Sequence, residues 1–266
     1  MSEFGGLLAG KVALVFGAGG AVGGAVGTAF AAEGARTYLS GRRRESVART
    51  AEASPKGSDV AVHEVDATDE AAVTAYVDGV HRAAGRIDVV FNAVGSTGHT
   101  RVVPSTILPL DAFMGYMSTM VRSQFLTARV AARHMLAART GVVIFLGATP
   151  ARGIVPQLAG PSTGHAAVEG MTRCLATEWG PHGIRVVAVR AGGMQETRNI
   201  GEVLGQFAAL QGISVDAMRQ MTNEKALLRR TPTLRETAAI ATFLASDRAS
   251  SITGAIINAS CGEVVD

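Results

Sequence analysis

A glycine-rich turn near the start of the chain has the composition of a phosphate-binding loop. Residues 17–24 read GAGGAVGG; they follow the apolar run 11–16 and precede a helical pattern. Glycines let the backbone approach a pyrophosphate closely, and the first turn of a helix offers free N–H groups and a partial positive charge. A G-x-G-x-x-G pattern alone is a weak signal that also fits a tight turn, but this one has the strand–turn–helix context of a dinucleotide site. The residues expected to contact the dinucleotide are Gly17, Gly19, Gly20, Val22 and Gly23.

The second β-rich run ends in a basic cluster. Arg42 and Arg43 stand where a domain selective for NAD usually carries an acid that binds the ribose hydroxyls. A guanidinium there would instead pair with a 2′-phosphate, through a charge-assisted bond of roughly 1.5–3 kcal/mol. This favours NADP(H), with Arg42 as the main phosphate ligand and Arg43 as the second. The alternative is a solvated basic start to the next helix, which is an unfavourable place for cations.

Composition and charge exclude several other classes of protein. The chain has 266 residues, of which 47% are apolar and 18% charged, enough for the core of one large α/β domain. A net charge of +3 with scattered arginines is not the basic stripe of a nucleic-acid-binding surface. No segment approaches the roughly 20 apolar residues of a membrane helix. Cys174 and Cys261 have no C-x-x-C partner, so we expect buried thiols, no metal site and a reducing, cytoplasmic location.

Short β-rich runs alternate with longer helical patterns along the chain. Strands are expected at 11–16, 36–40, 60–65, 87–92, 142–146, 184–189 and 255–259, and helices at 21–33, 42–53, 69–84, 111–138, 161–179 and 234–245. Repeated βα units imply a parallel sheet with helices on both faces, and right-handed crossovers give the doubly wound, Rossmann-type α/β fold. Ligands of such sheets bind at the carboxyl ends of the strands. Because no linker or repeat divides the sequence, we expect residues 1–266 to form a single domain.

In order and spacing, the motifs resemble those of the short-chain dehydrogenase/reductase family over essentially the whole chain. The glycine turn is similar to the family's T-G-x-x-x-G-x-G, with Phe16 for the threonine and Ala21 for the middle glycine. Residues 243–247 and 252–254 resemble its C-terminal signature. Each motif is loose alone, and together they make the resemblance specific.

The resemblance implies further contacts with the cofactor, which we expect to be NADP(H). Asp66 matches the acid that contacts the adenine ring. Asn92 and Gly95, in the run NAVG, resemble the family's N-N-A-G motif after the fourth strand. Gly192 stands in the turn that lies against the nicotinamide.

The residues with which this family moves protons have no match in the sequence. The family's Tyr-x-x-x-Lys, aligned through residues 166–168, falls on Pro161 and His165. In the family, the lysine lowers the pKa of the tyrosine, which exchanges a proton with the substrate oxygen. The family's serine falls on Ala148 and its asparagine near Met120. The resemblance therefore implies an atypical active site.

Four other residues are candidates for catalysis. His165 is expected to contact the cofactor ribose, act as an acid or base, or only pack. Thr149 would offer a hydroxyl if the serine position shifts by one residue. Tyr116 lies one turn before residue 120 and points either into the cleft or into the core. His99, in the loop after the fourth strand, faces either the substrate or solvent.

Segment 197–226 stands where the family has its substrate lid. Its apolar residues suit a cover over a small, largely apolar substrate, and equally two amphipathic helices that pack on the body. The resemblance also implies that helices 111–138 and 161–179 pack against a second subunit, in a homodimer or homotetramer.

Three functions remain open at this point. The first is an NADP(H)-dependent oxidoreductase with non-standard proton handling, which reduces an iminium carbon or an activated alkene. The second is a non-catalytic NADP-binding protein. The third is a non-redox enzyme, such as a cyclase or lyase, that uses the same pocket.

Overall fold

A computed structural model describes residues 6–95, 100–152 and 155–266. The strands are β1 (Val12–Phe16), β2 (Arg36–Gly41), β3 (Val60–Glu64), β4 (Val89–Asn92), β5 (Gly141–Ala148), β6 (Ile184–Ala191) and β7 (Ile256–Ala259). The α-helices are α1 (Ala21–Ala32), α2 (Arg44–Glu52), α3 (Glu70–Ala84), α4 (Leu110–Ala138), α5 (Ala159–Trp179), α6 (Arg198–Gln211), α7 (Val215–Lys225) and α8 (Leu234–Ala245). Short 3-10 helices are η1 (Ser105–Ile107), η2 (Thr149–Ala151), η3 (Gly180–His182) and η4 (Asp247–Ala249).

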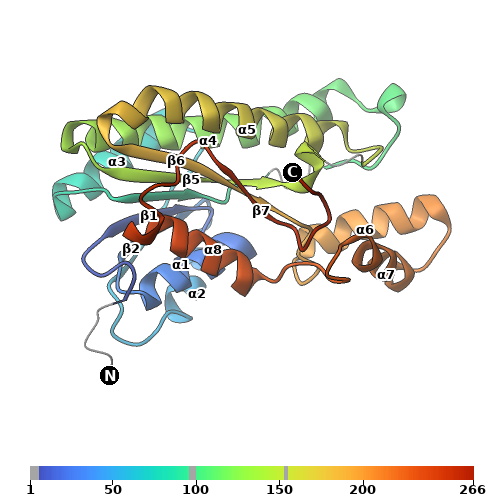
Figure 1. Ribbon diagram of the computed structural model, residues 1–266, viewed down its shortest axis with the longest axis horizontal. Coiled ribbons are helices and arrows are strands. Elements are labelled where there is room, and N and C mark those ends of the chain that lie inside the picture. The colour runs from blue at the N-terminus through green and yellow to red at the C-terminus, as the bar shows by residue number, and fades with distance from the viewer. Residues whose placement is uncertain (1–5, 96–99, 153–154) are drawn as a thin grey trace.

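The strands of the described residues form one seven-stranded parallel sheet in the order β3-β2-β1-β4-β5-β6-β7. Helices α3, α4 and α5 cover one face, and α1, α2 and α8 cover the other (Figure 1). Each face has its own core, with Val73 and Val77 of α3 in the first and Val26 and Phe30 of α1 in the second. The expected doubly wound fold is confirmed.

The order of the strands reverses beside β1. Strand β2 pairs with one side of β1 and β4 with the other, so the connections leaving β1 and β4 diverge at their carboxyl ends. A crevice at such a point is where open α/β sheets bind their ligands. The glycine turn, which follows β1, and the segment after β4 meet there.

Several element boundaries differ from those expected. Strands β5 and β6 each run two residues further, because their ladder continues through the pairs Gly147–Arg190 and Ala148–Ala191. Helix α2 begins at Arg44, so Arg42 and Arg43 precede it and do not form its first turn. Because β5 runs through residue 148, Ala148 is the last residue of that strand.

Helices α6 and α7, in the expected lid segment, extend beyond the end of the sheet (Figure 1). They pack on each other through a small core of Leu204, Ala208 and Met218. Leu210 and Met221 are exposed, so the lid is in part an amphipathic pair with its own core. The backbone N–H of Val102, in the loop before η1, donates to Gln206 Oε1 of α6 at 3.0 Å.

The expectation of two buried cysteines was wrong. Cys174 is exposed on α5, and Cys261 is half-buried after β7. Both are free thiols. Within the described ranges, no helix is long and apolar enough to cross a membrane.

Candidate cofactor and active site

The glycine turn has the space and the free backbone groups that a pyrophosphate needs. Gly17 has a positive φ of 76°, and a Cβ at Gly19 would lie 2.9 Å from the Cβ of Ser46. Gly20 is the N-cap of α1 and gives no side-chain cap, so helix geometry leaves the N–H groups of residues 21–23 without an acceptor in the helix. An anion at this terminus would find both these donors and the helix dipole. The residues present therefore fit a dinucleotide phosphate.

Asp66 and Arg42 lie together beside this turn, at the carboxyl ends of neighbouring strands. The Asp66 carboxylate accepts hydrogen bonds from the Thr68 N–H and hydroxyl at 2.9 and 2.7 Å. Burial acts to raise the pKa of Asp66, but the Thr68 hydrogen bonds and the guanidinium groups of Arg42 and Arg122 outweigh it, so the pKa is lowered. Arg42 and Arg43 are exposed and free to meet a phosphate.

Asn92 fixes the turn after β4. Its amide donates to the Ser123 carbonyl at 3.1 Å and to Thr127 Oγ1 at 2.9 Å, and its oxygen accepts from the Val94 N–H at 2.8 Å. Because Asn92 is buried and these bonds use both N–H groups of its amide, it holds the turn after β4 in place. Gly17 packs on the same turn, since a Cβ there would lie 2.9 Å from the Ala93 carbonyl carbon.

Gly95 and His99 are the other two residues that the sequence predicted near the cofactor or the substrate. Gly95 is exposed, with open space around the position of a Cβ. His99 lies outside the described residues.

Tyr116 and His165 form a hydrogen-bonded pair between α4 and α5. The Tyr116 hydroxyl lies 3.1 Å from His165 Nε2, and the rings meet edge to face. The tyrosine ring fits against α5 because residues 160 and 164 are glycines; a Cβ at Gly164 would lie 3.0 Å from the ring. Pro161, which the sequence alignment matched to the family's tyrosine, is buried in the first turn of α5. The structure thus brings together two of the residues predicted to act in catalysis.

Burial keeps both members of this pair uncharged. It lowers the pKa of His165 to about 4 and raises that of Tyr116. In either tautomer of the neutral imidazole, Nδ1 of His165 is enclosed without a hydrogen-bond partner among the described residues. A sugar hydroxyl can both donate and accept, so it would satisfy either tautomer.

Thr149 contacts Glu263, a residue that the sequence analysis did not single out. Its hydroxyl, buried at the start of η2, donates to Glu263 Oε2 at 3.1 Å. Gly192 completes the group: its N–H donates to the Ala259 carbonyl, and a Cβ on it would lie 3.3 Å from Glu263 Oε2. No local motif marks Glu263; the only available signal was an acid just after the C-terminal strand of a fold that binds ligands at strand ends.

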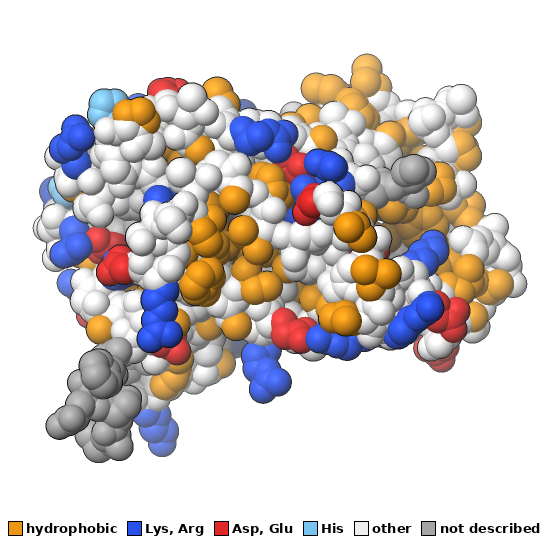
Figure 2. Space-filling view, in the orientation of Figure 1, with side chains coloured by type: hydrophobic (Ala, Val, Ile, Leu, Met, Phe, Trp, Pro, Cys, Tyr) orange, Lys and Arg blue, Asp and Glu red, His pale blue; other side chains and the backbone are white. Residues whose placement is uncertain are grey.

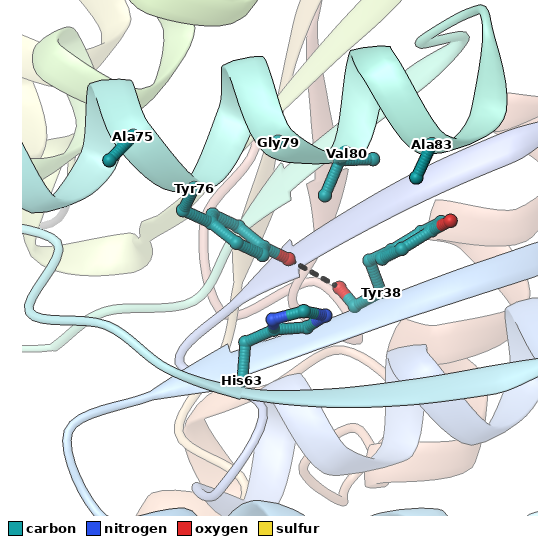
Figure 3. A pocket seen from close by; sticks show the side chains of 7 residues that line it. All are labelled: Tyr38, His63, Ala75, Tyr76, Gly79, Val80 and Ala83. Atoms are coloured by element: carbon teal, nitrogen blue, oxygen red, sulfur yellow. Dashed lines mark hydrogen bonds between the residues drawn. The ribbon is translucent and has the colours of Figure 1, made fainter.

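A separate cavity of about 190 Å³ lies under α3, against β2 and β3 (Figure 3). Tyr76 crosses it and donates to the Tyr38 carbonyl at 3.2 Å, and His63 faces both rings. None of the residues proposed for the cofactor or for catalysis lines it. We therefore place the active site in the crevice at the strand ends and not in this cavity.

Comparison with known proteins agrees with this geometry. Residues 17–263 match the family model described as enoyl-(acyl carrier protein) reductase. D-threitol dehydrogenase of Mycolicibacterium smegmatis is 32% identical over 258 residues, covering 93% of this chain and 90% of that protein. The peroxisomal 2,4-dienoyl-CoA reductase of Pongo abelii is 29% identical, covering 96% and 84%. The crystal structure of an NAD⁺-bound xylitol dehydrogenase superposes with a TM-score of 0.91 at 26% identity, covering 96% and 99%. The chain belongs to the short-chain dehydrogenase/reductase family, whose members are oxidoreductases that bind a nicotinamide cofactor.

Proposed function

We propose that this protein is an NADP(H)-dependent reductase of a small, largely apolar substrate, acting on an activated carbon–carbon double bond. One observation supports the proposal: the glycine turn and the start of α1 fit a dinucleotide phosphate, and Pro161, which we align with the family's tyrosine, is buried and has no proton to give. A substrate that needs no hydroxyl at that position suits this site. An iminium carbon, which becomes a neutral amine on accepting a hydride, is the second substrate class with this property.

Different residues of the chain would bind different parts of the cofactor. The N–H groups of residues 21–23 would hold the pyrophosphate, and Arg42 the 2′-phosphate, with Arg43 as its neighbour. Asp66 would contact the adenosine, and Nδ1 of His165 a hydroxyl of the nicotinamide ribose. When bound, the reduced nicotinamide supplies a hydride.

The names of relatives support the alkene over the iminium. The matching family model is described as an enoyl-(acyl carrier protein) reductase, and one relative is a 2,4-dienoyl-CoA reductase. Both names denote reduction of a double bond conjugated to a carbonyl group. In such a substrate, electron density moves to the carbonyl oxygen, and the proton is then delivered to carbon. Burial raises the pKa of Tyr116 and lowers that of His165, so Tyr116 is a weak acid and His165 a weak base, and we assign the pair a binding and orienting role.

The surface around the crevice suits an apolar substrate. Ile107 is exposed at the end of η1, and Leu110 and Met114 are exposed at the start of α4. Leu227 and Leu228 are exposed after α7. Apolar side chains gather at this end of the molecule (Figure 2). The lid segment 197–226 contributes two helices beside them (Figure 1).

Calorimetric titration with NADPH and NADH, followed by turnover assays, tests the proposal. We expect micromolar NADPH binding that is clearly tighter than NADH binding. We also expect NADPH oxidation with 2-cyclohexen-1-one and none with cyclohexanone, the matched saturated ketone. Oxidation with a cyclic imine alone would favour the second substrate class. Tight binding with no turnover of any probe would indicate a non-catalytic NADP-binding protein, and no binding of either nucleotide would refute the cofactor assignment.

We also propose that the outer face of α4 and α5 is the interface of a homo-oligomer. A groove there is lined by Phe125, Leu136, Leu175 and Trp179 among others, and the Phe125 side chain is 42% exposed. Light scattering should give a mass of at least twice 27.4 kDa. Phe125→Glu should lower that mass to the monomer value; a monomeric wild-type protein would contradict the assignment.

A further inference from the structure

Glu263 brings an acidic side chain to the end of the sheet where the family's catalytic serine would be. Thr149, its hydrogen-bond donor, directly follows Ala148, the last residue of β5. The same carboxylate oxygen lies against Gly192, just after β6. A carboxyl group thus stands between the ends of two neighbouring strands, in the region where doubly wound sheets bind their substrates.

The tail that carries Glu263 is held in place from both sides. After α7, the N–H groups of Leu227 and Leu228 donate to the carbonyls of Gly262 and Cys261 at 3.3 and 3.0 Å. At its end, Asp266 pairs with Arg190, which is 2% exposed. These contacts fix the position of Glu263 and join the tail to the lid segment.

The surroundings of Glu263 favour its protonated form. Burial raises the pKa of this carboxyl, while the Thr149 hydrogen bond and the charge of Lys225 on α7 offset part of the rise. Among the described residues, Lys225 is the charged side chain close enough to act on it. Oε1 accepts no hydrogen bond from the described part of the chain, so it is the carboxyl oxygen left for a substrate.

We propose that Glu263 is the proton donor of the reduction, in place of the family's tyrosine, and that Thr149 is its positioning residue. This rests on the proposed function. When bound, the reduced nicotinamide would supply a hydride to the β-carbon of the conjugated substrate, which would become an enolate. The O–H bond of Glu263 then breaks, its electron pair stays on the carboxylate, and the proton joins the α-carbon. Water returns a proton to Glu263 after product leaves.

The test compares Glu263→Gln with the wild-type protein. Glutamine keeps the size of the side chain and an oxygen for Thr149 but has no acidic proton. We expect unchanged NADPH affinity, a kcat for 2-cyclohexen-1-one lowered by about 10²-fold or more, and loss of the fall in rate that the wild type shows as Glu263 ionises at rising pH. Glu52→Gln, an exposed residue at the end of α2, is the matched control and should change neither quantity.

Thr149→Val separates the role of Glu263 as proton donor from the role of Thr149 as positioning residue. It removes a hydrogen bond to the ionised form, so the pH at which the rate falls should move upward while the fall itself persists. A Glu263→Gln variant that keeps both its kcat and its pH profile would overturn the proposal.

Infrared difference spectra of wild type against Glu263→Gln give a readout that needs no turnover. A protonated carboxyl signal should persist above the ordinary glutamate pKa of about 4.3. Ionisation in the ordinary range overturns the role of Glu263 whether or not the protein turns over a probe. Absence of NADPH binding by the wild type would instead be a failure of the proposed function.

Discussion

Replacing Gly23 by alanine would test the geometry of the phosphate-binding turn. A Cβ at this buried position would lie 2.3 Å from the Gly17 carbonyl oxygen and 2.7 Å from its carbon, both backbone atoms. Ordinary contact begins at 3.4 Å, so the turn must move by 3.4 − 2.3 = 1.1 Å. Overpacking of this kind costs about 1–3 kcal/mol, and the better helix propensity of alanine returns about 0.5–1 kcal/mol.

The difference, a net loss of up to about 2.5 kcal/mol, should lower the Tm by up to roughly 10 °C in a chain of this size. Because the displaced N–H groups are those proposed to bind the pyrophosphate, the Kd for NADPH should rise by about tenfold or more. Differential scanning calorimetry and isothermal titration measure the two effects. Gly79→Ala in α3 is the matched control, since its Cβ would meet only the Arg82 side chain at 3.9 Å.

An unchanged Tm and Kd in Gly23→Ala would refute this account of the turn. A lowered Tm with unchanged NADPH affinity would keep the packing argument and remove Gly23 from the cofactor site. If Gly79→Ala lost as much stability as Gly23→Ala, the effect would belong to helical glycines in general.

Three further variants probe the cofactor site and its support. Arg42→Ala should weaken NADPH binding by about 10- to 100-fold and leave NADH binding nearly unchanged, as calorimetry would show; equal losses for both would exclude a 2′-phosphate contact. The lowered pKa of His165 means that the unfolded chain takes up its proton first, so stability should fall as the pH drops from 6.5 to about 4. Urea unfolding should show that His165→Gln removes part of this loss, on the order of 3 kcal/mol; an identical pH dependence would contradict it. The Glu169 side chain is 5% exposed and pairs with Arg190 at 2.6 Å. Arg190→Met removes this cation from the buried carboxylate and should cost roughly 3–5 kcal/mol of stability. Adding Glu169→Leu should recover much of that loss, and no recovery would show that the buried charge is not its cause.

The sequence determined the order of the elements, and it predicted a cofactor site at the glycine turn. Apolar runs such as 12–16 and the glycines after them are local signals, and a strand–turn–helix unit is formed by neighbours in the chain. Arg42 could be singled out as a candidate phosphate ligand because it directly follows a strand. The fold followed from the repetition of such units, since parallel strands with right-handed crossovers allow few topologies.

Helix boundaries and the roles of side chains near the strand ends could be predicted less well from the sequence. Asn92 was expected at the cofactor; in the structure its amide group bonds to Ser123, Thr127 and Val94 and holds the turn after β4. A buried amide binds whichever groups the neighbouring helix presents, and the sequence around Asn92 does not contain that information.

Only the tertiary structure decided which groups stand together in the active site. Tyr116 and His165 are 49 residues apart, and Thr149 and Glu263 are 114 apart. The sequence left several roles open for His165 and gave none to Glu263, because a residue's hydrogen-bond partners and its loss of solvent depend on segments distant in the chain. A parallel sheet brings the ends of β5, β6 and β7 to one edge, and it is this convergence that places a carboxyl group where no local pattern indicates one.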